Sequence, residues 1–368
     1  MSRVNFSEER WQKVERDTMA WWAGELHRPL VWLSTTVPSG TDKPYSYQSN
    51  YPLSMTAHEV VDRYEPYMAA THYYGDGFPW WWVNFGPGIA AGFLGAKVNS
   101  VSDPSETVWF TPPAEMPIED LRLNYDPQNV WWQRVKDITA AIAERWQGQL
   151  AASITDLGGN LDILASFRET QRLLVEVVDQ PEEVDRLVAQ ITQLWVRYYN
   201  ELDAIVRPAC RGTSCWTPIW STGKTYMLQC DFSYMISPRM FERFVVPDLT
   251  ACCETLDHGF YHLDGIGEVP HLNHLLKIAR LRGIQWIPGA GQPEPEEWLP
   301  LLKRIRDGGK LCQVFVSPQG ARRIVQNLGG KGFLFVIYDN AHEFIQPERA
   351  EAFLQVLNDE DIYLNRAG

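Results

Sequence analysis

Eight short apolar segments recur along this chain, and the stretches between many of them have helical periodicity. Each segment is an almost continuous hydrophobic run, which is typical of parallel strands that are buried on both faces. We therefore expect strands at residues 30–34, 81–85, 150–156, 226–231, 260–264, 284–287, 312–317 and 334–339. This alternation restricts the fold more than any other feature of the sequence.

The intervening segments carry recognisable helix starts. Residues 181–202 form a long amphipathic pattern, with Val184, Leu187 and Ile191 on one face. Ser237 followed by Pro238 predicts an N-cap and a first helical residue, opening a helix that runs to about Asp257. Helices are also expected over residues 293–307, 318–327 and 347–358, each beginning at a proline.

Eight buried strands that alternate with helices predict an α/β protein with a (β/α)8 TIM barrel. No Pro/Gly/Ser-rich linker divides the 368 residues, so we expect one barrel domain over 1–368, with an N-terminal helical segment at 1–27. The long gaps at 35–80 and 86–149 are expected to hold helices and a loop excursion. A doubly wound sheet is the main alternative, but the segment after the first strand is a poor match to a glycine-rich phosphate turn.

The charge balance excludes several classes of partner. The net charge is −13, and no cluster of Lys or Arg longer than a pair occurs, which argues against nucleic acids and anionic membranes. No apolar run is long enough to cross a bilayer, and the N-terminus lacks a signal-peptide pattern. The six cysteines form no CxxC pair, as expected of reduced thiols, so we predict a cytoplasmic protein.

A barrel places its site at the carboxyl ends of its strands, where this sequence gathers acids and an imidazole. His262 and Asp264 are two residues apart on one strand, so their side chains share a face. Asp339 would lie nearby if the eighth strand closes the ring. One hypothesis is a divalent metal site, such as a zinc site, formed by His262, Asp264 and Asp339 or His342. The others are acid–base catalysis by His262 and a histidine that merely holds a strand end through a hydrogen bond.

The remaining candidates concern the substrate. The chain contains 16 tryptophans, and a tryptophan run beside Gly and Pro suits a pocket wall as well as a core. We predict catalytic roles for His262, Asp264 and Asp156. The predicted substrate-binding residues lie at or near strand ends and are Trp81, Trp82, Asn84, Gln229, Trp216 and Tyr338.

Two longer motifs resemble the uroporphyrinogen decarboxylase superfamily. They are ISPRMFERFVVPDL at 236–249 and YHLDGIGEVPHLNHLLKIARLRGIQWI at 261–287, and a third segment, 159–188, resembles a family helix with its D-x-P-E turn. The resemblance covers most of the chain from Arg28 onward and implies the (β/α)8 barrel independently of the strand count. NFGPGIAAGFLGAK and ETVWF are similar to a divergent bacterial branch.

The departures from the family motifs bear on activity. The segment 28–40 has no arginine after the strand, whereas true uroporphyrinogen decarboxylases resemble one another in arginines that hold the substrate's carboxylates there. The corrinoid-linked methyltransferases of the superfamily carry zinc through an H-x-C motif and a later cysteine. Here the motif reads His262-Leu263-Asp264, which replaces sulfur with oxygen.

The resemblance therefore implies a metal-dependent, methyltransferase-like enzyme that acts on a small organic molecule, with a corrinoid protein as its partner. For the assembly, we consider a homodimer. One alternative is a decarboxylase-like lyase on a small carboxylated substrate, with Arg168, Arg28 or Lys224 as the anion clamp. A second alternative is a non-catalytic barrel that binds a small molecule, which the change from cysteine to Asp264 favours.

Overall fold

The structure is a computed structural model that describes residues 4–37, 44–99, 107–339 and 342–367. Its helices are α1 (Glu8–Trp22), α2 (Ala57–Ala70), α3 (Ala90–Phe93), α4 (Val130–Arg145), α5 (Asn160–Arg168), α6 (Thr170–Asp179), α7 (Pro181–Val206), α8 (Pro238–Phe244), α9 (Val246–Thr255), α10 (Leu272–Lys277), α11 (Leu299–Asp307), α12 (Pro318–Leu328) and α13 (Pro347–Ala367). Short 3-10 turns occur at η1 (Gln48–Asn50), η2 (Ile118–Asp120), η3 (Asp231–Met235), η4 (Val269–His271) and η5 (Pro295–Glu297). No described helix is both long enough and apolar enough to cross a membrane.

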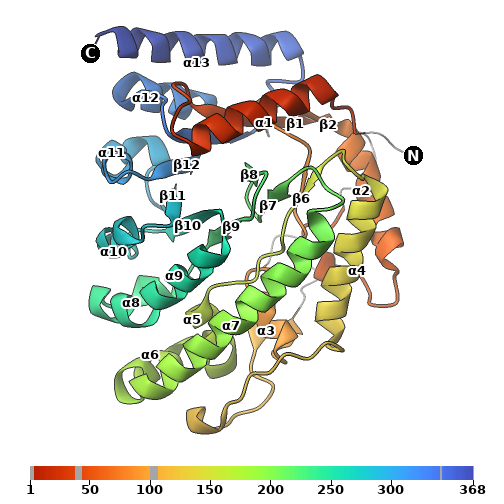
Figure 1. Cartoon of the computed structure of the whole chain (residues 1–368), viewed down its shortest axis with the longest axis vertical. Coiled ribbons are helices and arrows are strands. Elements are labelled where there is room, and N and C mark those ends of the chain that lie inside the picture. The colour runs from red at the N-terminus through yellow and green to blue at the C-terminus, as the bar shows by residue number, and fades with distance from the viewer. Residues whose placement is uncertain (1–3, 38–43, 100–106, 340–341, 368) are drawn as a thin grey trace.

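The strands are β1 (Leu30–Thr36), β2 (Thr71–Gly75), β3 (Trp80–Trp81), β4 (Lys97–Asn99), β5 (Trp109–Thr111), β6 (Ala151–Ala152), β7 (Thr213–Ser214), β8 (Trp220–Ser221), β9 (Thr225–Leu228), β10 (His258–Asp264), β11 (Leu281–Ile287), β12 (Leu311–Phe315) and β13 (Phe333–Tyr338). Seven of them form one sheet in the order β2-β1-β13-β12-β11-β10-β9, in which only β2 is antiparallel to its neighbour. A separate parallel pair joins β3 to β6. Helices surround these strands (Figure 1).

Each of the eight predicted strands overlaps a strand of the structure, but the ones predicted at 81–85 and 150–156 are much shorter than expected. β3 and β6 contain two residues each. Among the described residues, strand pairing does not close the ring, because it is interrupted between β1 and β3 and between β6 and β9. β2 occupies the free edge of β1, and β7 bridges to Ser153 beside β6. The result is a mostly parallel sheet of the TIM-barrel kind, and a closed eight-stranded ring is not shown.

Local sequence explains where the helices begin. The side chains of Ser237 and Ser317 accept hydrogen bonds from backbone N–H groups three residues on, and each is followed by a proline at the first helical position. The single helix expected from Ser237 to about Asp257 is in fact two helices, with a break at Val245. Pro247 explains the break, because proline has no N–H and its ring obstructs the preceding turn.

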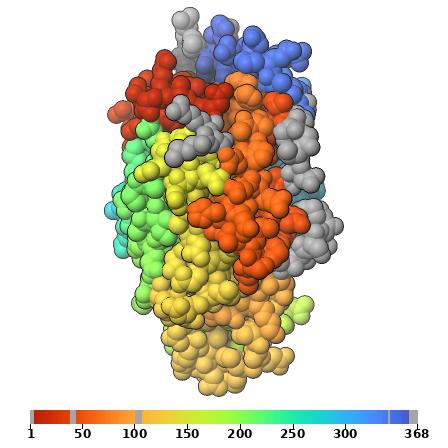
Figure 2. Space-filling model, turned by 90° about the vertical axis from the view of Figure 1, so that its right-hand side faces the viewer, coloured from red at the N-terminus to blue at the C-terminus, as the bar shows by residue number. Residues whose placement is uncertain are grey.

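Helix α1 covers the amino ends of the strands. Trp21 stacks on Phe260 with ring centroids 5.9 Å apart, and Trp22 stacks on His258 at 4.3 Å, both at the start of β10. On the face shown in Figure 2, α2, α4 and α7 lie side by side below α1 and α13. The amino ends of the strands are therefore packed, and the carboxyl ends carry the polar side chains.

Candidate functional site

Three side chains meet at the carboxyl ends of β9 and β10. His262 Nε2 lies 3.8 Å from Asp264 Oδ2, and single ligand atoms of Asp231, His262 and Asp264 all lie within 4.8 Å of one another. The pairing register explains the meeting, because Leu228 of β9 is opposite Tyr261 of β10. Three residues further along each strand's path come Asp231 and Asp264. We call these three residues the acid–imidazole cluster.

A chain of hydrogen bonds orients the imidazole from the other side. His262 Nδ1 is bonded to Gln285 Oε1, and Gln285 Nε2 donates to Gln313 Oε1 over 2.6 Å. Thr217 Oγ1 donates to the same oxygen of Gln313 over 3.3 Å. An amide oxygen only accepts hydrogen bonds, so Nδ1 carries the proton and the neutral ring presents the lone pair of Nε2 to the two carboxylates.

The electrostatics of the cluster favour a positive charge at its centre. Burial by itself would lower the pKa of His262, but the hydrogen bond to Asp264 and the charges of Asp231 and Asp264 outweigh it and raise that pKa. Desolvation raises the pKa of Asp231. The positive charge of His262 lowers that pKa, and the negative charge of Asp264 raises it. Two carboxylates next to one imidazole are thus mutually repelled unless a proton or another cation lies between them.

Further carboxyl groups surround the cluster. The pKa of Asp156 is raised to about 7, because burial and the charge of Asp231 outweigh the hydrogen bond that the N–H of Gly158 donates. Burial and the charge of Asp231 raise the pKa of Asp162 to about 8, although Asp162 accepts N–H groups from Asp231 and Phe232. The region therefore holds several protons at neutral pH.

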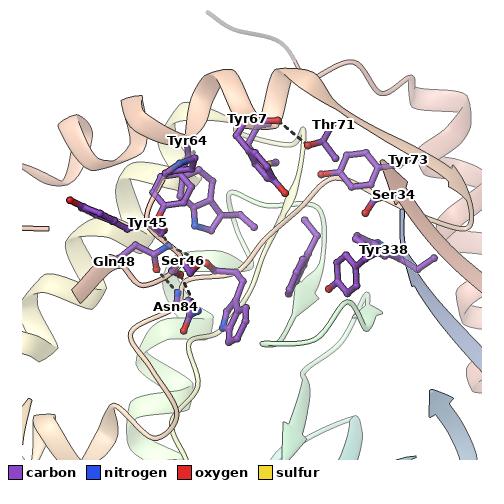
Figure 3. Close-up of a pocket in the computed structure, with 16 residues that line it drawn as sticks. Ser34, Tyr45, Ser46, Gln48, Tyr64, Tyr67, Thr71, Tyr73, Asn84 and Tyr338 are labelled. Atoms are coloured by element: carbon purple, nitrogen blue, oxygen red, sulfur yellow. Dashed lines mark hydrogen bonds between the residues drawn. The ribbon is translucent and has the colours of Figure 1, made fainter. Parts of the chain in front are cut away.

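An aromatic pocket lies at a different sector of the strand ends, near β1, β2, β3, β13 and α2. Its cavity is about 270 Å³, and nine of its sixteen lining residues are aromatic. Among the lining residues are four of the predicted substrate-binding residues: Trp81, Trp82, Asn84 and Tyr338. Figure 3 shows the hydroxyl groups of Tyr67, Tyr73 and Tyr338 pointing into this space.

Ring contacts hold the walls of the aromatic pocket. Trp32 meets Tyr73, Trp80 and Tyr338 edge to face, at centroid distances of 5.9, 6.2 and 5.3 Å. Trp80 also connects the pocket to the cluster, because its Nε1 donates to the carbonyl of Cys215 over 3.1 Å. The next residue, Trp216, packs edge-on against the His262 ring at 5.0 Å. One hydrogen bond, one peptide unit and one ring contact thus connect the pocket wall to the cluster.

The other predicted site residues lie elsewhere. The Asp339 carboxylate is bonded to the backbone N–H groups of Glu343 and Phe344, and Asp339 is not part of the acid–imidazole cluster. β13 is three strands away from β10, which explains the separation. His342 is exposed and also outside the cluster. Gln229 is buried with Oε1 lacking a hydrogen-bond partner, and it does not line the aromatic pocket.

The three cations considered as an anion clamp are bound to other groups. Arg168 pairs with Glu176, Arg28 pairs with Asp76 and Asp17, and Lys224 donates to Asn200. Each one is therefore committed to a partner within the fold, and this disfavours a carboxylated substrate held by any of them.

The sequence predicted four of the sixteen residues that line the pocket and missed the other twelve. Tyr64 and Tyr67 come from α2 and Tyr73 comes from β2, elements within a gap for which we predicted only unspecified helices and a loop. The capping box of Thr56 and Glu59 is a local signal for the start of α2. Asp231 is the last residue of the strand predicted at 226–231, but its approach to His262 depends on strand register.

Comparison with solved structures shows the fold. The "methyltransferase from Methanosarcina mazei" is similar to this chain with a TM-score of 0.62 and 11% sequence identity, covering 94% of this chain and 98% of that one. No protein-family model and no curated protein matches the sequence. At this identity the likeness supports the architecture and leaves the chemistry to the residues themselves.

The orientation of His262 yields a prediction. In Gln285→Leu the Nδ1–H loses its acceptor, so the neutral ring is expected to shift to the Nε2–H tautomer, which can donate to Asp264. In Gln285→Glu a carboxylate oxygen still accepts, and Nδ1–H should persist. The measurement is the ¹⁵N chemical shifts of the His262 ring nitrogens at alkaline pH. A wild-type ring protonated on Nε2 would contradict the assignment.

Proposed function

We propose that the chain is a (β/α)8 barrel enzyme of the uroporphyrinogen decarboxylase superfamily, related to its methyltransferases. The mostly parallel sheet and the shared fold of a methyltransferase support this. In this proposal, residues 1–368 form one domain with a helical segment at 1–27, and strands β3 and β6 complete the ring that the hydrogen bonds leave open.

We infer that the acid–imidazole cluster holds a divalent metal ion and that the aromatic pocket binds a small organic substrate for methyl transfer. The observation that carries the proposal is the convergence of Asp231, His262 and Asp264. One imidazole and two carboxylates suit a first-row divalent ion such as zinc. The fit extends beyond the ligands, because Gln285 fixes the ring with Nε2 facing the carboxylates.

The residues have distinct roles in this proposal. When bound, the metal would act as a Lewis acid that lowers the pKa of a methyl-accepting thiol. Asp231 and Asp264 supply negative charge, and His262 supplies a nitrogen that Gln285 and Gln313 orient. Asp156, with its pKa raised to about 7 by burial, can accept or release a proton beside the cluster near neutral pH. A corrinoid protein is the proposed source of the methyl group.

Metal binding is the first test. Chelator-treated protein is titrated with zinc by calorimetry, and with cobalt(II) by visible spectroscopy. We expect one site in the wild type and an affinity lower by about a hundredfold or more in His262→Ala, because even outer-shell partners of a metal contribute ten- to a hundredfold. His58→Ala is the control, since His58 is exposed, pairs with Glu144 and is not a member of the cluster. Equal affinities in all three proteins would refute the metal site.

Methyl transfer is the second test. Metal-loaded protein is mixed with free methylcobalamin and a small thiol, and loss of the methyl group is followed by absorbance. We expect thiol-dependent loss that requires His262. A protein that binds metal without this reaction would instead be a ligand-binding barrel.

A further inference from the structure

Within the ranges that the structure describes (4–37, 44–99, 107–339 and 342–367), the residues that line the aromatic pocket have uncharged side chains. None of its sixteen lining residues is a lysine, arginine, histidine, aspartate or glutamate, and the polar ones are hydroxyl and amide groups. Burial raises the pKa of Tyr73 above the usual value of about 10, at which a phenol is already protonated at neutral pH. A charged ligand would therefore interact with the aromatic rings and with the electrostatic potential of the whole protein, and not with an opposite charge on a described lining residue.

This environment discriminates between ligand charges. An anion brought into the cavity would lose its hydration without gaining a cationic partner among the described lining residues, and it would enter a protein of net charge −13. A cation would instead be attracted by the negative face of each aromatic ring that it contacts, and nine of the sixteen lining residues are aromatic. A neutral ligand would gain apolar burial but none of this electrostatic attraction.

We propose that the aromatic pocket binds a compact organic cation of the quaternary ammonium class. The rings come from Trp32, Trp80, Tyr67, Tyr73 and Tyr338. Contacts of Trp32 with Tyr73, Trp80 and Tyr338 hold these four rings in place before the ligand arrives. A trialkylammonium group has no N–H, so it needs no hydrogen-bond acceptor in the box. The inference rests on the proposed function in one respect, which is that the aromatic pocket is the substrate site.

Three probes of nearly the same shape test the ligand class. They are choline, the neutral 3,3-dimethylbutan-1-ol and the anionic 3,3-dimethylbutanoate, each titrated into metal-free protein by calorimetry. We expect choline to bind about tenfold more tightly than the neutral alcohol, or better, and the carboxylate not to bind. Equal or tighter binding of the neutral alcohol, or no binding of choline, overturns the proposal.

A pair of variants at the pocket rim identifies the interaction. Tyr67 belongs to α2, and its side chain is 38% exposed. Tyr67→Phe keeps the ring and removes the hydroxyl, whereas Tyr67→Leu removes the ring. Cation–π binding predicts choline affinity within about twofold of wild type for Tyr67→Phe and about a tenfold loss for Tyr67→Leu. An equal loss in both variants would assign the binding to the hydroxyl and overturn the proposal.

The result is separable from the outcome of the methyl-transfer test. Choline binding is measured on metal-free protein without turnover, and Asp231, His262 and Asp264 do not line the pocket. Choline binding without methyl transfer would remove only the proposed reaction. Methyl transfer to the thiol without choline binding would remove only the ligand class.

Discussion

Replacing Arg168 with methionine is expected to lower the free energy of unfolding by about 3–5 kcal/mol, because it leaves a buried carboxylate without its principal partner. Arg168 Nε lies 2.9 and 3.1 Å from the two carboxylate oxygens of Glu176, and both side chains are almost fully buried. Arg168 also donates to the carbonyl of Met116 over 2.6 Å. Urea unfolding followed by circular dichroism measures the loss.

Two further variants isolate the cause. Arg172 contacts the same carboxylate from a side chain that is 45% exposed, so Arg172→Met should cost only about 0–1 kcal/mol. The double variant Arg168→Met/Glu176→Met removes both buried charges and should recover most of the stability. A single variant that loses less than about 1 kcal/mol, or a double variant as unstable as the single one, would contradict this account.

Asp248→Asn is expected to stabilise the protein at pH 8 by up to about 4 kcal/mol. Burial raises the pKa of Asp248 to about 7, although Thr192 and Cys252 lie within hydrogen-bonding distance. The ordinary pKa of an aspartate is about 3.9. Because the folded state binds this proton more tightly, its stabilising effect is complete below about pH 4 and is lost as the pH rises to about 7.

The measurement compares urea unfolding of the wild type and Asp248→Asn between pH 4.5 and pH 8. The difference between the two proteins should be small at pH 4.5 and grow with pH, since asparagine carries no charge at either pH. Asp137→Asn on the exposed face of α4 is the control and should follow the wild type. A difference that is independent of pH would show that Asp248 is ionised throughout.

The sequence predicts the strands and the helix starts well because both depend on local chemistry. Apolar runs at β10 to β13 and proline-led helix starts at 181, 318 and 347 coincide with the observed elements. The prediction fails where a distant segment intervenes. β2 pairs antiparallel with the free edge of β1, and no residue pattern in either strand predicts this pairing.

The site shows the same division. The pairing of His262 with Asp264 follows from the alternation of side chains along one strand, so it could be predicted from adjacent residues. The approach of Gln285 and Asp231 depends on the register of β10 with β11 and β9, in which His262 is opposite Gln285 and Tyr261 is opposite Leu228.

By itself, the sequence determined the α/β alternation, the acids and the imidazole at the strand ends, and the negative charge. Only the tertiary structure decided which of these groups meet, because contact between strands depends on register and strand order. It placed Asp339 at a strand three positions away and brought Asp231 to His262 instead. It also assembled the aromatic pocket from α2, β1, β2 and β13, whose aromatic residues are distant along the chain and share no local pattern.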